Sequence, residues 1–196
     1  MPPQPPLYVI RHGQTDWNAE FRLQGQADVP INALGRDQAF GNGRRLARLI
    51  GQAEAFRFIA SPMGRTRETM EIVRGAMGLD PDDYVTDARL VEVHFGDWQG
   101  RTFAEIDRDT PGAIAERDRD KWNFVPPGAA AESYAMLMAR VLPVFEELHG
   151  PTVVVAHGGI IRSLFRRNGL SEYKAATLTI PQDRLLRVSG DRLEWL

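Results

Sequence analysis

The sequence predicts an α/β protein, a doubly wound three-layer sandwich with a mostly parallel central sheet and a small inserted cap. Short apolar runs of strand length alternate with amphipathic helical patterns along most of the chain, which is typical of a parallel sheet covered by helices on both faces. Two of these runs are followed, within two residues, by a histidine and then a glycine, at His12 and at His157. The stretch at approximately 95–133 departs from the alternation, and a connection of that length indicates a cap insertion.

The first half of the chain contains two strand-and-helix units. Leu7 to Ile10 and Phe56 to Ala60 are apolar runs of strand length. Apolar or small residues at helical spacing predict a helix over 33–50, and Asn32 is available as its N-cap. Ser61-Pro62 is expected to open the next helix.

The second half begins with two short helices and ends with a strand, a helix and a hairpin. Thr102 to Glu105 is a capping-box pattern that starts one helix, and Thr110-Pro111 is expected to start another. The strongest amphipathic stripe extends from Tyr134 to Leu148 and is interrupted by Pro143, which should kink the helix or mark an early turn. The remaining predictions are a strand at 152–156, a helix at about 160–167 and a terminal hairpin of 185–189 with 193–196.

The composition favours a single domain over residues 1–196, with a proline-rich tail at 1–6. Hydrophobic residues make up 43% of the chain and charged residues 26%, as is ordinary for a soluble globular domain. A formal net charge of -2 gives no basic face for nucleic acid. The N-terminus lacks the pattern of a secretory signal and no segment reaches membrane-spanning length. We therefore expect a cytoplasmic protein, monomer or homodimer, without a membrane partner.

Metal and thiol chemistry find little support in the residue types. The chain has no cysteine, and its four histidines are scattered rather than paired at helical spacing. Neither a cysteine nucleophile nor a zinc cage is therefore expected. A P-loop is also missing, and we expect a site that uses no metal ion and no other cofactor.

Two polar segments follow directly on predicted strands. They are Arg11-His12-Gly13 and His157-Gly158-Gly159. An isolated tripeptide of the first kind more often contains a structural histidine than a functional one. Parallel strands, however, end at the same edge of a sheet, so the fold can bring His12 and His157 together. Arginine binds phosphate in a bidentate manner, histidine can act as a nucleophile, and glycine lets a ligand approach the backbone.

Four segments, in this order, resemble the motifs of the histidine phosphatase superfamily, which is also called phosphoglycerate-mutase-like. They are Arg11 to Asn18 with Arg22 to Gly25, Ser61 to Thr69, Leu90 to Gly100, and Val155 to Gly159. Each motif alone is weak evidence, but their joint occurrence in order makes chance a poor explanation. The resemblance implies the fold given above and a short phosphatase-type enzyme that acts on a small phosphorylated substrate.

The resemblance also implies a role for each residue of a dispersed site. His12 would attack phosphorus and form a phosphohistidine, and Glu92 would act first as general acid and then as general base. The residues that would hold the phosphoryl oxygens are Arg11, Asn18, Arg65 and His157. Their positive charge would stabilise the transition state in place of a metal ion. Candidates for further substrate contacts are Gln24, Gly25 and Gly158, and the roles of His94 and Glu132 stay undecided.

Two other functions remain open. Cofactor-dependent phosphoglycerate mutases use the same phosphohistidine but return the phosphoryl group to another hydroxyl, and Glu92 to Gly96 has some similarity to their pattern. Against a mutase, the chain is short, and Phe103 stands where a substrate-binding lysine usually follows Gln-Gly. The cap also lacks an adjacent arginine pair, since Asp118 separates Arg117 from Arg119. A catalytically idle phosphate-binding or scaffold protein is disfavoured because nucleophile, acid and clamp residues are all present.

Overall fold

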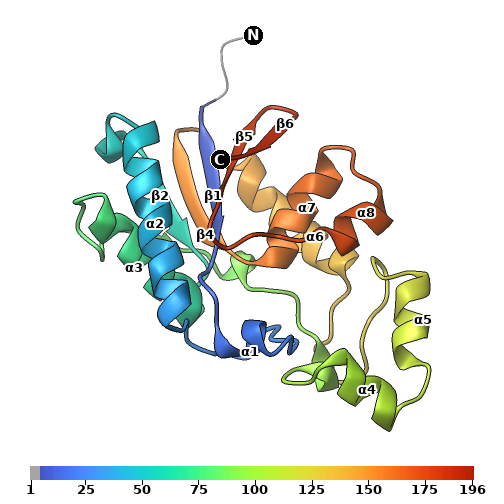
Figure 1. Ribbon diagram of the computed structural model, residues 1–196. Helices are drawn as coiled ribbons and strands as arrows, with labels where there is room; N and C mark the ends of the chain where they lie inside the picture. The colour runs from blue at the N-terminus through green and yellow to red at the C-terminus, as the bar shows by residue number, and fades with distance from the viewer. Residues whose placement is uncertain (1–4) are drawn as a thin grey trace.

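The computed structural model, which describes residues 5–196, contains a six-stranded sheet with helices on both faces (Figure 1). In spatial order the strands are β3 (Val85–Thr86), β2 (Arg57–Ala60), β4 (Thr152–Ala156), β1 (Leu7–Arg11), β5 (Leu185–Ser189) and β6 (Arg192–Trp195). The first four strands are parallel to one another, β5 is antiparallel to β1, and β6 is antiparallel to β5. The predicted fold class and the terminal hairpin are therefore confirmed. Of the tail predicted at 1–6, residues 1–4 lie outside the described residues.

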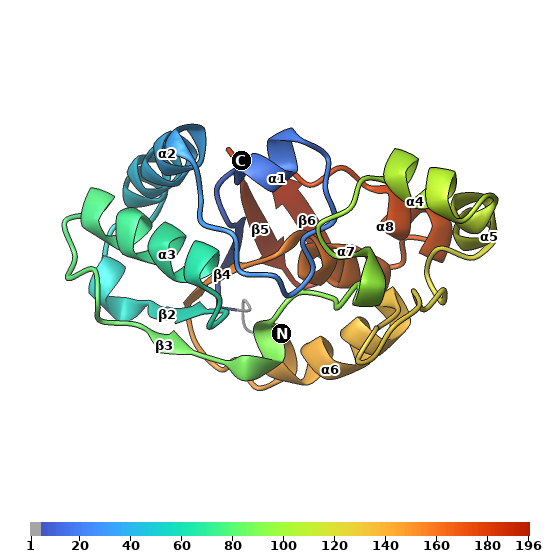
Figure 2. The same cartoon turned by 90° about the horizontal axis from the view of Figure 1, so that it is seen from below.

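Two long helices cover each face of the sheet and complete the three layers (Figure 2). One face carries α2 (Ala33–Leu49) and α3 (Gly64–Ala76), and the other carries α6 (Tyr134–Glu146) and α7 (Gly158–Arg167). Strand β4 contributes to both apolar cores. Val153 and Val155 belong to the core with α2 and α3, whereas Val154 and Ala156 belong to the core with α6 and α7. Every residue of β4 is buried, which explains its uninterrupted apolar sequence.

Helices α2 and α6 agree closely with their predicted ranges. The Asn32 side chain accepts a hydrogen bond from the Gly35 amide and is the N-cap of α2. Helix α6 continues through Pro143 to Glu146. Because Pro143 lies in the last turn, the single hydrogen bond that it removes does not end the helix.

Helices α3 and α7 begin at other residues than predicted. Helix α3 begins at Gly64 rather than at Ser61-Pro62, because the Ser61 amide still donates a hydrogen bond to the carbonyl of Val155 in β4 and so remains part of the strand pairing. Helix α7 begins at Gly158 rather than near residue 160. Glycine is a poor helix former, but the Gly159 amide in this first turn binds a side chain of the site described below.

The segment at 95–133 contains two short helices that lie beyond the carboxyl ends of β1 and β4 (Figure 1). They are α4 (Phe103–Asp109) and α5 (Ala113–Arg119). The capping box of α4 is confirmed, because Thr102 and Glu105 each accept a hydrogen bond from the other's amide. Helix α5 begins after Gly112, which has a left-handed φ of 87°. The start predicted at Thr110-Pro111 is wrong because Thr110 ends α4.

Two short helices were not predicted. They are α1 (Asp16–Ala19), which Thr15 caps, and α8 (Glu172–Thr177), which Ser171 caps. Segments this short contain too few residues for a helical apolar period to be visible. Short 3₁₀ turns occur at Ala53–Ala55, Ala88–Leu90 and Gly96–Trp98.

Two glycines of α2 offer a matched test of the packing between α2 and α3. A Cβ on Gly43 would lie 2.6 Å from the Val73 carbonyl oxygen and 2.7 Å from the Ala76 Cβ, whereas a Cβ on Gly41 would meet nothing within 4 Å. We expect Gly43→Ala to lower the free energy of unfolding by about 1–3 kcal/mol. Gly41→Ala should raise it by about 0.5–1 kcal/mol, because alanine is the better helix former. Urea unfolding measures both changes, and an equal response of the two variants would contradict the packing.

Candidate active site

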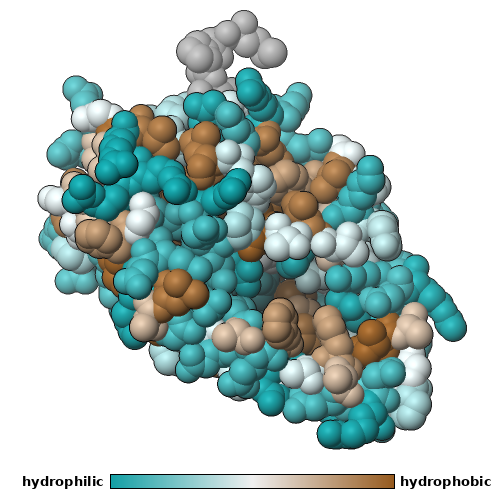
Figure 3. Space-filling model, in the orientation of Figure 1, coloured by the Kyte–Doolittle hydropathy of each residue, from teal (hydrophilic) through white to brown (hydrophobic). Residues whose placement is uncertain are grey.

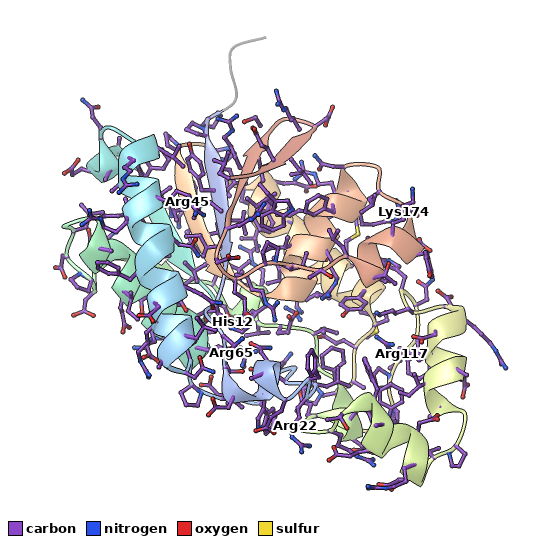
Figure 4. The ribbon with its side chains drawn as sticks, viewed as in Figure 1. His12, Arg22, Arg45, Arg65, Arg117 and Lys174 are labelled. Atoms are coloured by element: carbon purple, nitrogen blue, oxygen red, sulfur yellow. The ribbon has the colours of Figure 1, made fainter. Side chains whose placement is uncertain are left out.

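The pairing of β1 with β4 brings the two predicted histidines together. Arg11 is opposite Ala156 in the register, and the His12 amide donates to the Ala156 carbonyl at 3.0 Å. The next residue of each strand is a histidine, and the rings of His12 and His157 lie edge to face with centroids 5.3 Å apart. Both rings are buried. Figure 4 shows His12 and Arg65 close together below the end of β1.

One nitrogen of the His12 ring is engaged and the other is available. Nδ1 lies 2.8 Å from the Gly13 carbonyl oxygen. Because a carbonyl only accepts, Nδ1 carries the proton and Nε2 keeps its lone pair. Burial lowers the pKa of His12 well below 6.5, and the charges of Arg65 and Arg11 lower it further. His12 is therefore a neutral imidazole with an available nucleophilic nitrogen at neutral pH.

Two arginines, the buried Arg65 and the half-buried Arg11, flank His12 and keep unused hydrogen-bonding capacity. Arg65 has no exposed surface and donates at 2.7 Å to two carbonyls of the loop 25–27. Arg11 donates at 2.7 Å to one backbone carbonyl. Within residues 5–196, the Nε of each arginine is buried without a partner. Burial lowers the pKa of both groups, that of Arg11 to about 10. Buried donors of this kind indicate a binding position for an anion.

His157 lies beside His12 in the interior. Its Nε2 is 2.8 Å from the Ser61 Oγ, and its Nδ1 has no partner in the described part of the chain. Burial, followed by the charge of Arg65, lowers the pKa of His157 well below 6.5. The positive charge expected at His157 from the sequence is therefore not carried by the protein alone at neutral pH. Ser61, the residue after β2, orients this ring, and the sequence had not assigned it a role in the site.

Asn18 is positioned to act as a neutral donor. Its side-chain oxygen accepts from the Thr15 amide at 3.2 Å and from Gln182 at 3.0 Å. Both lone pairs are thus engaged, which leaves the amide NH₂ group for a ligand. Gln182 also donates to the His12 carbonyl at 3.1 Å. Gln182 lies in the loop before β5, where no motif marked it.

Two backbone amides hold the carboxylate of Glu92. Its oxygens accept from the amides of Val93 at 2.9 Å and Gly159 at 3.1 Å. A Cβ on Gly159 would strike this carboxylate and would lie 2.6 Å from a methyl carbon of Leu137. Glycine at position 159 is therefore what allows Glu92 to approach the first turn of α7 and to line the same cavity as His12.

An ion pair behind Glu92 fixes the segment that carries it. Arg140 pairs with Glu132 at 2.8 Å and donates to two carbonyls of the segment 89–91. Glu132 also accepts from the His94 amide at 3.1 Å. Among the described residues that line the cavity, neither Glu132 nor His94 is present. The two residues whose roles the sequence left undecided thus hold the backbone around Glu92.

The candidate residues other than His157 open onto one cavity of about 420 Å³ at the carboxyl ends of β1 and β4, whereas His157 is fully buried beside His12 and is not part of the cavity lining. Figure 3 shows the surface hollowed near the middle of this view. The predicted residues that line the cavity are Arg11, His12, Asn18, Gln24, Gly25, Arg65, Glu92 and Gly158. Lining residues to which the sequence gave no role in the site include Phe21, Lys121, Tyr134, Arg162 and Gln182. None of these residues directly follows a strand. They reach the site only through the packing of the folded chain, so no local sequence signal marks them.

Other features of the described chain point to no competing site. A hollow of about 480 Å³ at the other end of the sheet, lined by His149 and Arg167 among others, includes none of the candidate residues. Residues 5–196 contain no group of three or more His, Cys, Asp or Glu that could hold a metal ion. No helix in that range combines the length and apolarity needed to cross a membrane.

A family model matches most of the chain. The model is that of the histidine phosphatase superfamily (branch 1), and the match covers residues 7–189. Glucosyl-3-phosphoglycerate phosphatase of Mycobacterium tuberculosis is 37% identical over 172 residues, which cover 81% of this chain and 72% of that protein. A probable phosphoglycerate mutase of Klebsiella pneumoniae is 32% identical over 196 residues, which cover 97% of this chain and 87% of the other.

Solved structures agree with this match. The native structure of mycobacterial glucosyl-3-phosphoglycerate phosphatase has a TM-score of 0.77 and 31% identity, covering 98% of this chain and 96% of its own. The same phosphatase in complex with VO3 gives the same TM-score, identity and coverage. A chain described as mycobacterial hydrolase 1 gives a TM-score of 0.78 at 32% identity, covering 98% of this chain and 95% of its own.

The two buried histidines make stability depend on pH. Below the ordinary value of 6.5 the unfolded chain binds protons at His12 and His157, whereas the folded chain does not. The contribution of each neutral histidine to the free energy of unfolding is therefore complete above pH 6.5. It is lost as the pH falls below this value, at up to about 1.4 kcal/mol per pH unit for each histidine. Urea unfolding between about pH 7 and about pH 5.5 measures this slope.

A pair of variants isolates the source of the slope. His157→Gln should reduce it, whereas His149→Gln, at the other end of the sheet, should leave it unchanged. An unchanged slope in His157→Gln would show that the ring titrates in the folded protein as it does in the unfolded chain.

Proposed function

Because this chain belongs to the histidine phosphatase superfamily (branch 1), we propose that it hydrolyses a small phosphorylated metabolite through a phosphohistidine on His12. The enzyme is cytoplasmic and needs no metal ion, and the segment at about 95–133 acts as a cap over the site. The observation that carries the proposal is the neutral His12 between Arg11 and Arg65. Among residues 5–196, the one ion pair of these arginines is a 4.0 Å contact of Arg65 with the exposed Asp28.

The first step transfers the phosphoryl group to the protein. Arg11, Arg65 and Asn18 bind the non-bridging oxygens. The His12 Nε2 attacks phosphorus, so that an N–P bond forms while the P–O bond to the leaving group breaks. Protonated Glu92 gives its proton to the departing oxygen, which leaves as an alcohol. The hydrogen bond from Nδ1 to a backbone carbonyl stabilises the positive charge of the phosphorylated ring.

The second step returns the protein to its starting state. The Glu92 carboxylate takes a proton from a water molecule, whose oxygen attacks phosphorus. The N–P bond breaks, inorganic phosphate leaves, and His12 regains a neutral ring with a free Nε2. The same two arginines stabilise the charge that develops on the phosphoryl oxygens in both steps.

The size of the site and the names of relatives support a small organic phosphate as substrate. A cavity of about 420 Å³ falls in the range of small-molecule sites, about 300–1,000 Å³. The relative from Mycobacterium tuberculosis is named for its action on glucosyl-3-phosphoglycerate. We propose a substrate of comparable size for this chain.

A phosphoglycerate mutase is the weaker alternative, and its product separates it from a hydrolase. With 3-phosphoglycerate as substrate, release of inorganic phosphate supports the hydrolase, whereas formation of 2-phosphoglycerate supports the mutase. A panel of phosphoserine, sugar phosphates and nucleotides then ranks the substrates.

Removal of the nucleophile should abolish turnover. We expect His12→Ala to lower kcat for p-nitrophenyl phosphate by at least about 10³-fold, because the variant lacks the imidazole nitrogen that attacks phosphorus. His149→Ala, at the other end of the sheet, should retain the wild-type rate, and EDTA should inhibit neither the wild-type protein nor His149→Ala. Unchanged turnover in His12→Ala would refute the phosphohistidine mechanism.

The general acid should be needed most where the leaving group is poor. Glu92→Gln should lower kcat for an alkyl phosphate by about 10²–10⁴-fold. With p-nitrophenyl phosphate, whose phenolate leaves without a proton, the variant should release a burst of one phenolate per active site and then accumulate base-stable phosphoprotein. Rapid-quench measurements detect both effects. Equal losses for the two substrates and no burst would exclude Glu92 as the acid.

A further inference from the structure

The cavity carries more positive charge than one phosphate group requires. The cationic side chains that line it are Arg11, Arg22, Arg65, Arg117, Lys121 and Arg162, and among the described lining residues Glu92 is the one carboxylate. Arg22 is already paired with Glu20 at 2.7 Å and with Glu105 at 2.8 Å. A phosphomonoester brings at most two negative charges, which Arg11 and Arg65 can match. Three further cations therefore remain in the same cavity, of which Arg117 alone has an ion pair among the described residues, with the exposed Asp118.

These three residues, Arg117, Lys121 and Arg162, form what we call the cap cluster. Arg117 belongs to α5, Lys121 follows that helix, and Arg162 belongs to α7. Arg117 is buried, and its guanidinium lies 4.4 Å from the centre of the Phe103 ring and pairs with Asp118 at 2.6 Å. Figure 4 shows Arg117 on the side of α5 that faces the sheet. The guanidinium is thus held in place at the cavity wall.

Lys121 has an unfavourable electrostatic environment in the protein alone. No ion pair of Lys121 occurs within the range that the structure covers, and its charged neighbours are Arg117, Arg162 and Asp118. Burial lowers the pKa of Lys121 to about 8, and the two arginines add to this shift. Asp118 opposes it, but the Asp118 side chain is 55% exposed and already paired with Arg117. An additional anion at this position would relieve the repulsion.

Arg162 connects the cap cluster with the phosphate-binding residues. A Cβ on Gly158 would lie 3.3 Å from a terminal nitrogen of Arg162 and 3.7 Å from the Arg11 Nε. Both guanidinium groups therefore border the same glycine. Their repulsion contributes to the lowered pKa of Arg11. The positive lining is thus continuous from the phosphate position to α5.

We propose that Arg117, Lys121 and Arg162 form a second anion subsite, which binds a carboxylate or a second phosphate of the same substrate molecule. The proposal rests on the proposed function in placing the reacting phosphate at His12. The subsite touches no reacting atom, and it makes the enzyme prefer phosphorylated acids over phosphomonoesters with an uncharged tail.

Non-hydrolysable ligands test the subsite without turnover. The wild-type protein is titrated calorimetrically with ω-carboxyalkylphosphonates of increasing chain length and with alkylphosphonates of the same lengths. At the best length the carboxylate should tighten binding at least about tenfold, as charge-assisted hydrogen bonds to a partly buried anion do. Alkylene bisphosphonates form a third series, and tighter binding of these identifies the second anion as a phosphate.

Matched variants locate the effect. Lys121→Met keeps most of the side-chain volume and should remove most of the carboxylate advantage, whereas Lys174→Met, on the exposed surface of α8, should preserve it. Arg117→Met and its exposed neighbour Arg119→Met provide a second pair on α5. The advantage should also decline above about pH 8, because burial lowers the pKa of Lys121 to about 8. The charged groups that face Lys121 are Arg117, Arg162 and Asp118.

Two results would overturn the subsite. One is equal affinity of the uncharged-tail series and both doubly anionic series at every length. The other is an equal loss of affinity for all series in Lys121→Met. Failure of the proposed function would give a different result, because p-nitrophenyl phosphate would then not be hydrolysed in a His12-dependent manner. Calorimetry with phosphonates measures binding and not hydrolysis, so the two failures can be told apart.

Discussion

The parallel pairing of β1 with β4 is the constraint on which the site depends. The hydrogen bond from the His12 amide to the Ala156 carbonyl extends the ladder one residue beyond β1. On the other side of β4, the Ser61 amide donates to the Val155 carbonyl in the same way. Three neighbouring strands thus deliver His12, His157 and Ser61 side by side. A slip of one residue in either pairing would turn these side chains to the opposite face, and the two histidine rings would no longer meet.

Burial of positive charge is the second physical theme of the structure. Backbone carbonyls of the loop 25–27 accept from Arg65, so the guanidinium is solvated by the chain but not neutralised. Burial of the two rings, followed by the charge of Arg65, keeps His12 and His157 neutral. An anion bound among these groups relieves repulsion that the folded protein otherwise tolerates. Ligand binding and stability are therefore coupled, because an anion that binds only the folded state stabilises that state.

The strands and the polar residues that meet at their ends could be predicted because their signals are local. An apolar run followed by Arg11-His12-Gly13, or by His157 and two glycines, combines a strand and its functional end in one short segment. Helix boundaries were less visible, as at Gly64, where the start depends on how far β2 remains paired with β4. The support of Glu92 by Arg140 and Glu132 could not be predicted either, because it joins positions far apart in the sequence through backbone carbonyls.

The cavity also explains why motifs predict the reaction better than the substrate. Its reacting half is built at the ends of strands, where neighbouring residues are fixed by the sheet. Its other half comes from α5, the turn that follows it and α7. In the sequence, Arg117 was notable only because Asp118 separates it from Arg119. Arg162 stands on the rigid helical layer, whereas Arg117 and Lys121 stand on the segment beyond the sheet. A ligand held by all three would therefore join the two parts, so its binding energy would also help to position the cap over His12.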